Sequence, residues 1–209
     1  MTRLQAGVSV ALLTVTLWGQ RPASSSKVPA RAKSSAPGAG AISDGVYRNL
    51  SFGFSYKLPY GWVDRTSEMQ DDSTGPTNAA AKSLLLLAIF ERPPEAAGET
   101  VNSAVVIAAE SLSSYSGMKT AADYFGPLTE LATAKGFQPV EDPHGFPIGA
   151  TQLVREDFSK LRGTTSVRQT SLVVLERGYA ISFTFIGGSE DEVNELIEKL
   201  SFAPRKPAH

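Results

Sequence analysis

The residues that could support acid–base chemistry or metal binding are few in this sequence. Among 209 residues there are two histidines and no cysteine, and one of the histidines, His209, is the last residue. His144 follows Glu141 and Asp142 in the segment VEDPHGFP. This spacing matches no zinc motif, and flanking prolines and glycine are typical of a surface turn. We therefore expect His144 to lie in a solvated turn and not in a metal site.

Nucleophilic and carboxylate catalysis also lack their usual residue patterns. No G-x-S-x-G segment is present, and the absence of cysteine excludes thiolate nucleophiles, cysteine-ligated zinc and disulfides. The adjacent acids Glu156 and Asp157, like Asp71 and Asp72, could supply a carboxylate pair, but neighbouring side chains on a strand point to opposite faces. The sequence thus predicts no catalytic residue, no metal ligand and no cofactor, and favours a protein that is not an enzyme. A carboxylate-dependent hydrolase is the enzymatic alternative.

The candidates for ligand contact are two aromatic residues, Tyr60 and Trp62, in the segment GFSYKLPYGW at residues 53–62. Rings near the end of a strand could stack on a carbohydrate or a peptide. In the alternative interpretation Trp62 folds back and closes one end of the core, while Pro59 and Gly61 shape the corner. The sequence favours this structural alternative.

The N-terminal residues have the composition of an export signal and a linker. Arg3 precedes an apolar run at residues 6–18, so residues 1–19 are typical of a secretory signal peptide, with a short uncleaved anchor as the alternative. Residues 20–43 are rich in Ser, Ala, Pro and Gly and predict a disordered tether, and residues 205–209 predict a disordered tail. We expect an exported protein, periplasmic or extracellular, or one tethered to the inner membrane.

The charge distribution argues against nucleic-acid binding. Five of the 20 basic residues and none of the 21 acids precede residue 44, so the remainder carries a formal net charge of −6. A nucleic-acid-binding protein needs a basic face to neutralise phosphates. The basic tether could contact anionic lipid or cell-wall polymer, although a solvated linker is the simpler interpretation.

Residues 44–204 predict a single α+β domain. Regular patterns indicate a hairpin that Pro59 ends, two buried strands, a helix, three antiparallel strands and a final helix capped by Ser189. In sequence order after the hairpin, these elements are expected at residues 83–91, 101–112, 120–136, 148–159, 165–176, 179–187 and 189–200. Pro127 implies either a kink in the first helix or a late helix start. The polar segment at residues 64–82 has no regular period and predicts a flap or a disordered loop.

The two ends of this domain resemble the PsbP-like α/β sandwich group. The resemblance rests on Y-x-N followed by GFSYKLPYGW, and on the closing segment GYAISFTFIGGSEDEVNELIEKLSF, and it spans roughly residues 46–204. The group includes the PsbP extrinsic subunit of photosystem II, a Ran-binding nuclear-transport factor and small exported bacterial proteins of unknown role. The resemblance implies a twisted, largely antiparallel sheet with helices packed on it, and a non-enzymatic role. No ligand motif matches, so no functional residue is carried over.

These observations lead to one favoured function and one alternative. We expect an accessory protein of the cell envelope that binds a protein partner through the rim of its sheet or through the flap at residues 64–82. The alternative is a carrier that holds a small molecule or lipid in a cleft between helix and sheet.

Overall fold

The computed structural model describes residues 38, 40–73, 83–96, 98 and 100–204. The expected signal peptide, most of the expected tether and the expected tail lie outside the described residues. Among the described residues, no helix has both the length and the apolar character that a bilayer-spanning segment requires.

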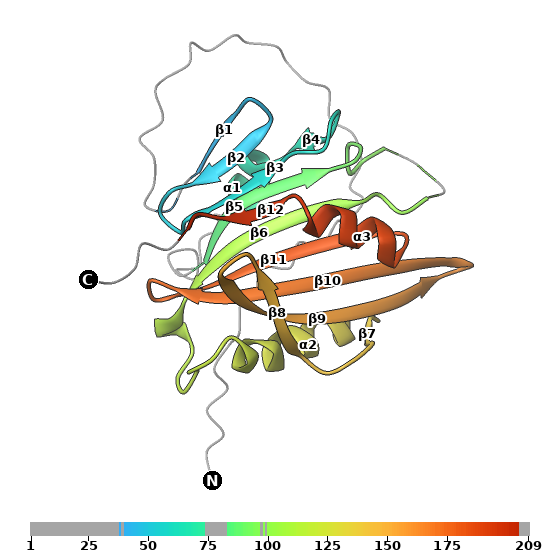
Figure 1. Cartoon of the computed structure of the whole chain (residues 1–209). Helices are drawn as coiled ribbons and strands as arrows, with labels where there is room; N and C mark the ends of the chain where they lie inside the picture. The colour runs from blue at the N-terminus through green and yellow to red at the C-terminus, as the bar shows by residue number, and fades with distance from the viewer. Residues whose placement is uncertain (1–37, 39, 74–82, 97, 99, 205–209) are drawn as a thin grey trace.

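Two antiparallel sheets form the framework (Figure 1). The small sheet has the order β1-β2-β3-β12, with strands Ala41–Ser43, Val46–Asn49, Phe54–Lys57 and Leu200–Phe202. The large sheet has the order β4-β5-β6-β11-β10-β9-β7, and β8 also pairs with β9. In chain order its strands are Val63–Asp64, Ser83–Phe90, Ala104–Ser111, Gln138–Pro139, His144–Ile148, Thr151–Arg162, Thr165–Glu176 and Tyr179–Gly187.

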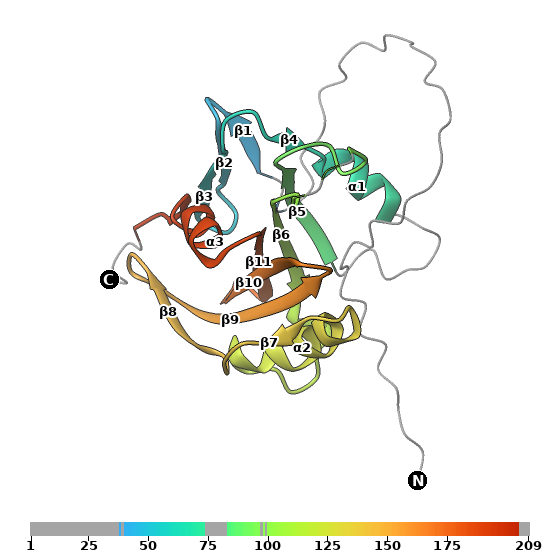
Figure 2. The ribbon, with the colours of Figure 1, turned by 90° about the vertical axis from the view of Figure 1, so that its right-hand side faces the viewer.

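Helices cover both faces of the large sheet, as Figure 2 shows. The small sheet and α3 (Glu190–Ile197) pack on one face, and α2 (Phe125–Ala134) packs on the other. Helix α1 (Thr66–Ser73) packs against β5 on the same face of the large sheet as α2. Residues Leu112–Ser114 and Ala122–Tyr124 form short 3-10 turns. The expected α+β fold, a largely antiparallel sheet with helices packed on it, is confirmed. The division of the strands into two sheets was not expected.

Aromatic side chains fill the space between the small sheet, α3 and the large sheet. The rings of Phe54 and Phe183 meet edge to face with centroids 5.0 Å apart. Tyr56 is fully buried, and its hydroxyl donates a hydrogen bond to the carbonyl of Leu196 at 3.1 Å. Tyr56 of the segment GFSYKLPYGW therefore fixes α3 against the small sheet, and Phe54 fixes the small sheet against the large one.

The folded part begins earlier than the sequence indicated. Residues 41–43 were expected in the disordered tether, but they form β1 and pair with β2. Asp44 and Gly45 form the two-residue turn between these strands, with φ angles of 52° and 69°. An Asp-Gly pair favours this type of hairpin turn, which places Ala41 opposite Arg48.

The expectation of an irregular segment over residues 64–82 is wrong for its first part. Residues 66–73 form α1, and Asp64 caps it by accepting hydrogen bonds from the Thr66 amide at 2.9 Å and from the Thr66 hydroxyl at 2.6 Å. Met69 packs against Ala88 and Phe90 of β5. Hydrogen bonds also join α1 to β5: Gln70 donates to the Leu85 carbonyl at 2.7 Å, and the Thr66 hydroxyl accepts from the Ala88 amide at 2.9 Å. Because polar contacts hold much of this helix, no helical period of apolar residues was visible in the sequence. Residues 74–82 lie outside the described residues.

Strands β10 and β11 have the predicted bounds, whereas β9 lies three residues later than predicted and α2 is shorter. Arg177 and Gly178 have φ angles of 51° and 81° and form the tight turn between β10 and β11. Helix α2 starts at Phe125, so Pro127 occupies its first turn and causes no kink. The Ser189 hydroxyl accepts a hydrogen bond from the Glu192 amide at 3.1 Å and caps α3 as predicted.

Candidate functional site

The two aromatic candidates lie in different environments. Tyr60 is fully exposed at a turn in which Gly61 has a φ of 80°, whereas Trp62 is half-buried and packs against the main core. The Trp62 amide donates to the carbonyl of Pro59 at 3.5 Å across this turn. Tyr60 and Trp62 line neither of the two clefts described below.

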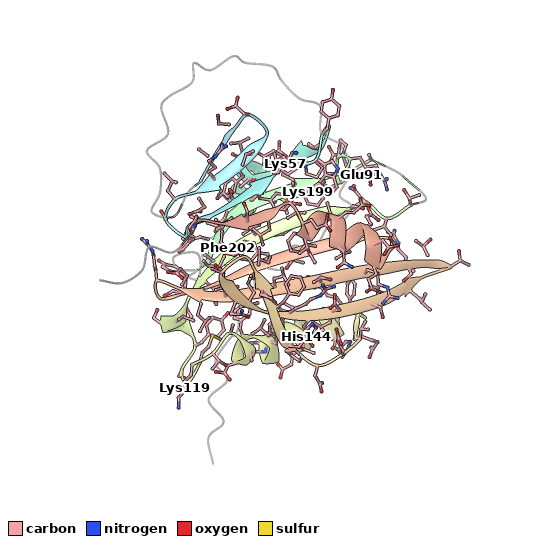
Figure 3. All side chains as sticks on the ribbon, viewed as in Figure 1. Lys57, Glu91, Lys119, His144, Lys199 and Phe202 are labelled. Atoms are coloured by element: carbon pink, nitrogen blue, oxygen red, sulfur yellow. The ribbon has the colours of Figure 1, made fainter. Side chains whose placement is uncertain are left out.

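The segment around His144 is a strand, so the prediction of a surface turn there is wrong. Residues 144–148 form β8, which pairs with β9 across a short turn that contains Gly149. His144 itself is exposed at the first residue of β8 (Figure 3), with Nδ1 3.6 Å from Oε1 of Glu141 and 3.3 Å from the Asp142 carbonyl. Within the described ranges, no group of three or more His, Cys, Asp or Glu residues could hold a metal ion.

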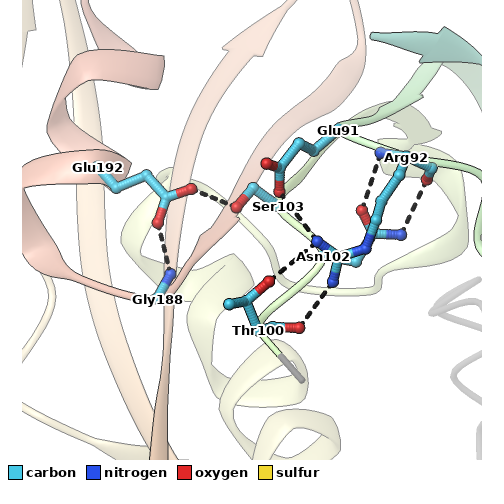
Figure 4. Close-up of polar contacts among 7 residues, drawn as sticks. All are labelled: Glu91, Arg92, Thr100, Asn102, Ser103, Gly188 and Glu192. Carbon is cyan, nitrogen blue, oxygen red and sulfur yellow. Dashed lines mark hydrogen bonds and ion pairs between the residues drawn. The ribbon is translucent and has the colours of Figure 1, made fainter. Parts of the chain in front are cut away.

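A polar cluster ties the loop between β5 and β6 to the start of α3 (Figure 4). Arg92 and Asn102 exchange two hydrogen bonds, at 3.1 and 2.9 Å, and the Arg92 guanidinium donates to the carbonyl of Thr100 at 2.7 Å. The Glu192 carboxylate accepts from the Ser103 hydroxyl and, at 2.8 Å, from the Gly188 amide. The bonds of Arg92 hold the loop between β5 and β6, and the bond between Ser103 and Glu192 joins this loop to α3. The role of the cluster is therefore structural.

A polar cleft of about 220 Å³ lies between α3 and strands β8 to β10. Arg155 crosses it: the guanidinium binds the Asp157 carboxylate at 2.7 and 3.0 Å, reaches Oδ1 of Asn194 at 3.1 Å, and lies 5.1 Å from the Phe146 ring centroid. Thr170 also donates to Asp157. The charges at the centre of this cleft are thus already paired within the protein.

An open groove of about 780 Å³ lies on the opposite face, along α2. Its walls come from small residues of α2 and of the 3-10 turn before it, with two prolines at and near the edge strand β7: Ala122, Gly126, Thr133, Ala134, Pro139 and Pro143. Figure 2 shows α2 beside β7 on this side of the large sheet. We call this site the α2 groove.

The α2 groove has a buried acid at its base. Glu156 is 2% exposed, and its two carboxylate oxygens lie 2.8 and 3.0 Å from the Thr129 hydroxyl. Burial raises the pKa of Glu156 above its usual value, Thr129 partly offsets this, and the negative charges of Asp142 and Asp157 raise it further. Asp142 and Glu130 also line the groove. All the charged side chains in the described lining are therefore acidic.

A second buried acid lies under the same helical layer but has a different environment. Glu110 is 5% exposed and accepts hydrogen bonds from the hydroxyls of Tyr115 and Tyr124. The pKa of Glu110 is raised overall, because burial outweighs the two tyrosine hydroxyls, which lower it. Glu110 does not line the α2 groove. Its two donors give this carboxylate a satisfied, closed environment.

Sequence reasoning placed Glu156 and Asp157 on opposite faces of a strand, and the structure has them there. Asp157 faces Arg155 and α3, and Glu156 faces Thr129 of α2. Glu156 is not a surface charge, because α2 covers it. One signal was available: Glu156 alternates with Val154 and Phe158, which belong to the apolar face of β9.

Several solved structures are similar to this chain at low sequence identity. No family model and no curated protein matches the chain. Similar solved structures include the cyanobacterial PsbP protein CyanoP from Synechocystis sp. PCC 6803, with a TM-score of 0.46 and 12% identity, over 83% of this chain and 98% of that one.

Two further similar structures come from other bacteria. LpqN, which is involved in cell envelope biogenesis of Mycobacterium tuberculosis, has a TM-score of 0.38 and 14% identity, over 72% of this chain and 83% of that one. A protein of unknown function from Pseudomonas aeruginosa has a TM-score of 0.38 and 15% identity, over 81% of this chain and 99% of that one.

Proposed function

We propose that this protein is a non-enzymatic accessory protein of the cell envelope that binds a protein partner through the α2 groove. The observation that carries the proposal is an open, apolar groove beside β7, an edge strand of the large sheet. Exposed apolar surface that polar residues border is typical of interaction sites. The groove lies at the sheet rim, where the sequence led us to expect a partner.

The shape and chemistry of the groove fit a polypeptide better than a small molecule. Gly126 leaves open space where a side chain would stand, and its small neighbours Ala122 and Thr133 allow a partner backbone to approach α2 closely. Ligand sites for small molecules are concave and bury most of the ligand. The polar cleft beneath α3 is smaller, and its central charges are paired, so a carrier function has less support there.

One observation favours the enzymatic alternative. Glu156 and Asp142 line the same groove, and the pKa of Glu156 is raised, as a general acid of a carboxylate-dependent hydrolase requires. The apolar walls offer few donors that could orient a substrate, which favours the docking function. A hydrolase would lose its turnover in the Glu156→Gln variant.

The docking proposal is tested by photo-cross-linking in the producing cell. A photoreactive benzoylphenylalanine replaces Thr133, which is exposed at the groove, or Leu161, which is 76% exposed at the far end of β9. We expect Thr133 to yield one cross-linked protein, attached through one segment, that Leu161 does not yield. The Gly126→Phe variant, which fills the groove, should abolish this product.

The matched control is Gly126→Ala, which adds a side chain too small to close the groove. Both substitutions place their Cβ in open space on a helix, so neither strains the backbone. Retention of the product in Gly126→Ala and its loss in Gly126→Phe support the proposal. Three results would overturn it. The same product could form from Leu161, the product could be unaffected by Gly126→Phe, or the cross-link could attach to residues 20–37 of the chain itself.

A further inference from the structure

We infer that the partner anchors in the α2 groove through a lysine or arginine side chain that forms an ion pair with Glu156. This inference rests on the proposed docking function and names the chemistry of the partner. It follows from the charge of the groove, from the incomplete hydrogen bonding of Glu156, and from the shape of the walls.

The charge of the groove selects a basic partner. Three acids line it, Glu130, Asp142 and Glu156, and the lining in the described part of the chain contains no lysine or arginine. Acids that line a groove without an internal cation create a negative potential that attracts a positive group and repels a negative one.

The hydrogen bonding of Glu156 is incomplete. A carboxylate can accept about four hydrogen bonds, and both oxygens of Glu156 share the single hydroxyl proton of Thr129. Two neighbouring acids differ: the partly buried Asp157 binds Arg155, and the buried Glu110 accepts from two tyrosines. Glu156 is therefore the buried acid that both lines an open groove and lacks a charged donor among the described residues.

The walls fit the stem of a basic side chain. Lysine and arginine have an apolar chain that ends in a charged group, and they bury the chain against apolar surface. Gly126, Ala122 and Pro143 supply such surface above Glu156. A cation that reaches Glu156 gains a charge-assisted hydrogen bond to a carboxylate that is itself only 2% exposed.

The inference is tested with two small probes of nearly equal shape. The n-butylguanidinium ion mimics an arginine side chain, and n-butylurea is its neutral counterpart. Nuclear magnetic resonance of the full chain follows the Thr129 methyl group during titration with each probe. We expect n-butylguanidinium to bind at least about tenfold more tightly than n-butylurea, as a desolvated charge-assisted bond requires.

The variant Glu156→Gln separates charge from shape. It keeps the size of the side chain and an acceptor for Thr129, so we expect the preference for n-butylguanidinium to disappear while the fold remains. Glu195→Gln, which removes an exposed acid from α3 on the opposite face, should leave the preference unchanged. Equal binding of the two probes to the wild-type protein, or an unchanged preference in Glu156→Gln, would overturn the inference.

The cross-linking experiment distinguishes this inference from the docking proposal. If the Thr133 product depends on Gly126 but is unaffected by Glu156→Gln, docking stands and the basic anchor is wrong. If Gly126→Phe leaves the product unchanged, the docking site itself is wrong, whatever the probes show. If both variants abolish the product, the anchor and the site are supported together.

Discussion

The variant Glu156→Gln should make the protein more stable at neutral pH. Burial raises the pKa of Glu156 in the folded state above its ordinary value of 4.5. The folded state therefore binds this proton more tightly than the unfolded state does. The carboxyl group contributes stability that is fully present below the unfolded pKa and is lost as pH rises through the folded pKa. Glutamine does not titrate, so the variant keeps its stability over that window.

The size of this stability effect depends on how far folding raises the pKa of Glu156. Each unit by which folding raises the pKa corresponds to about 1.4 kcal/mol in the free energy of unfolding. The new amide group could add a cost of its own, because its N–H groups need acceptors at the groove base. That cost does not depend on pH, so it cancels when the stability difference at pH 7 is compared with the difference at pH 4.

The assay combines two independent measurements on the full chain. Carbon-13 titration of the Glu156 carboxyl group gives its folded-state pKa, and urea unfolding of both proteins at several pH values gives the stability difference. We expect the advantage of the variant to grow with rising pH, by about 1.4 kcal/mol for each measured unit above the ordinary value, and then to remain constant. A measured pKa at or below the ordinary value, or a stability difference that does not change with pH, would refute the reasoning.

Three further substitutions test local contacts by urea unfolding. Tyr56→Phe should lower the free energy of unfolding by about 1 kcal/mol, because it removes the hydrogen bond to the Leu196 carbonyl. The Lys199 amide still donates to that carbonyl at 3.3 Å. A loss above about 2.5 kcal/mol would mean that the carbonyl is left unpaired. Ser189→Ala should cost about 1 kcal/mol through loss of the α3 cap, and no change would contradict the capping role. Gly126→Ala should stabilise α2 by about 0.5 kcal/mol, and a loss of stability would show that the space beside it is not open.

The fold could be predicted from sequence where local signals were strong. Strands β10 and β11 alternate or stay apolar over many residues, and the two-residue turn at Arg177 and Gly178 fixes their pairing. Helix α3 has a cap, acids in its first turn and one apolar stripe. Short elements that depend on distant partners could not be predicted: β12 has three residues and exists because it pairs with β3.

The candidate site was harder to predict for a physical reason. In the sequence Glu156 is one of many acids, and its alternation with Val154 and Phe158 shows only that it lies on an apolar face. What makes it unusual is that α2 covers this face, through contacts between residues that are distant in sequence, such as Phe125 with Phe158. Burial by a distant helix leaves no local pattern.

The two faces of the large sheet are suited to different tasks. On the face beneath α3, the aromatic residues Phe54 and Tyr56 are buried in the core. The charge of Arg155 on this face is paired with Asp157. A ligand that entered there would have to displace internal contacts. On the α2 face a carboxylate remains that weakens the fold at neutral pH and has room above it. A buried group that costs stability is expected where binding uses it. If Glu156 instead proves dispensable for binding, its burial serves no function that we can identify. Its replacement by glutamine would then raise the stability of the protein at neutral pH without weakening binding.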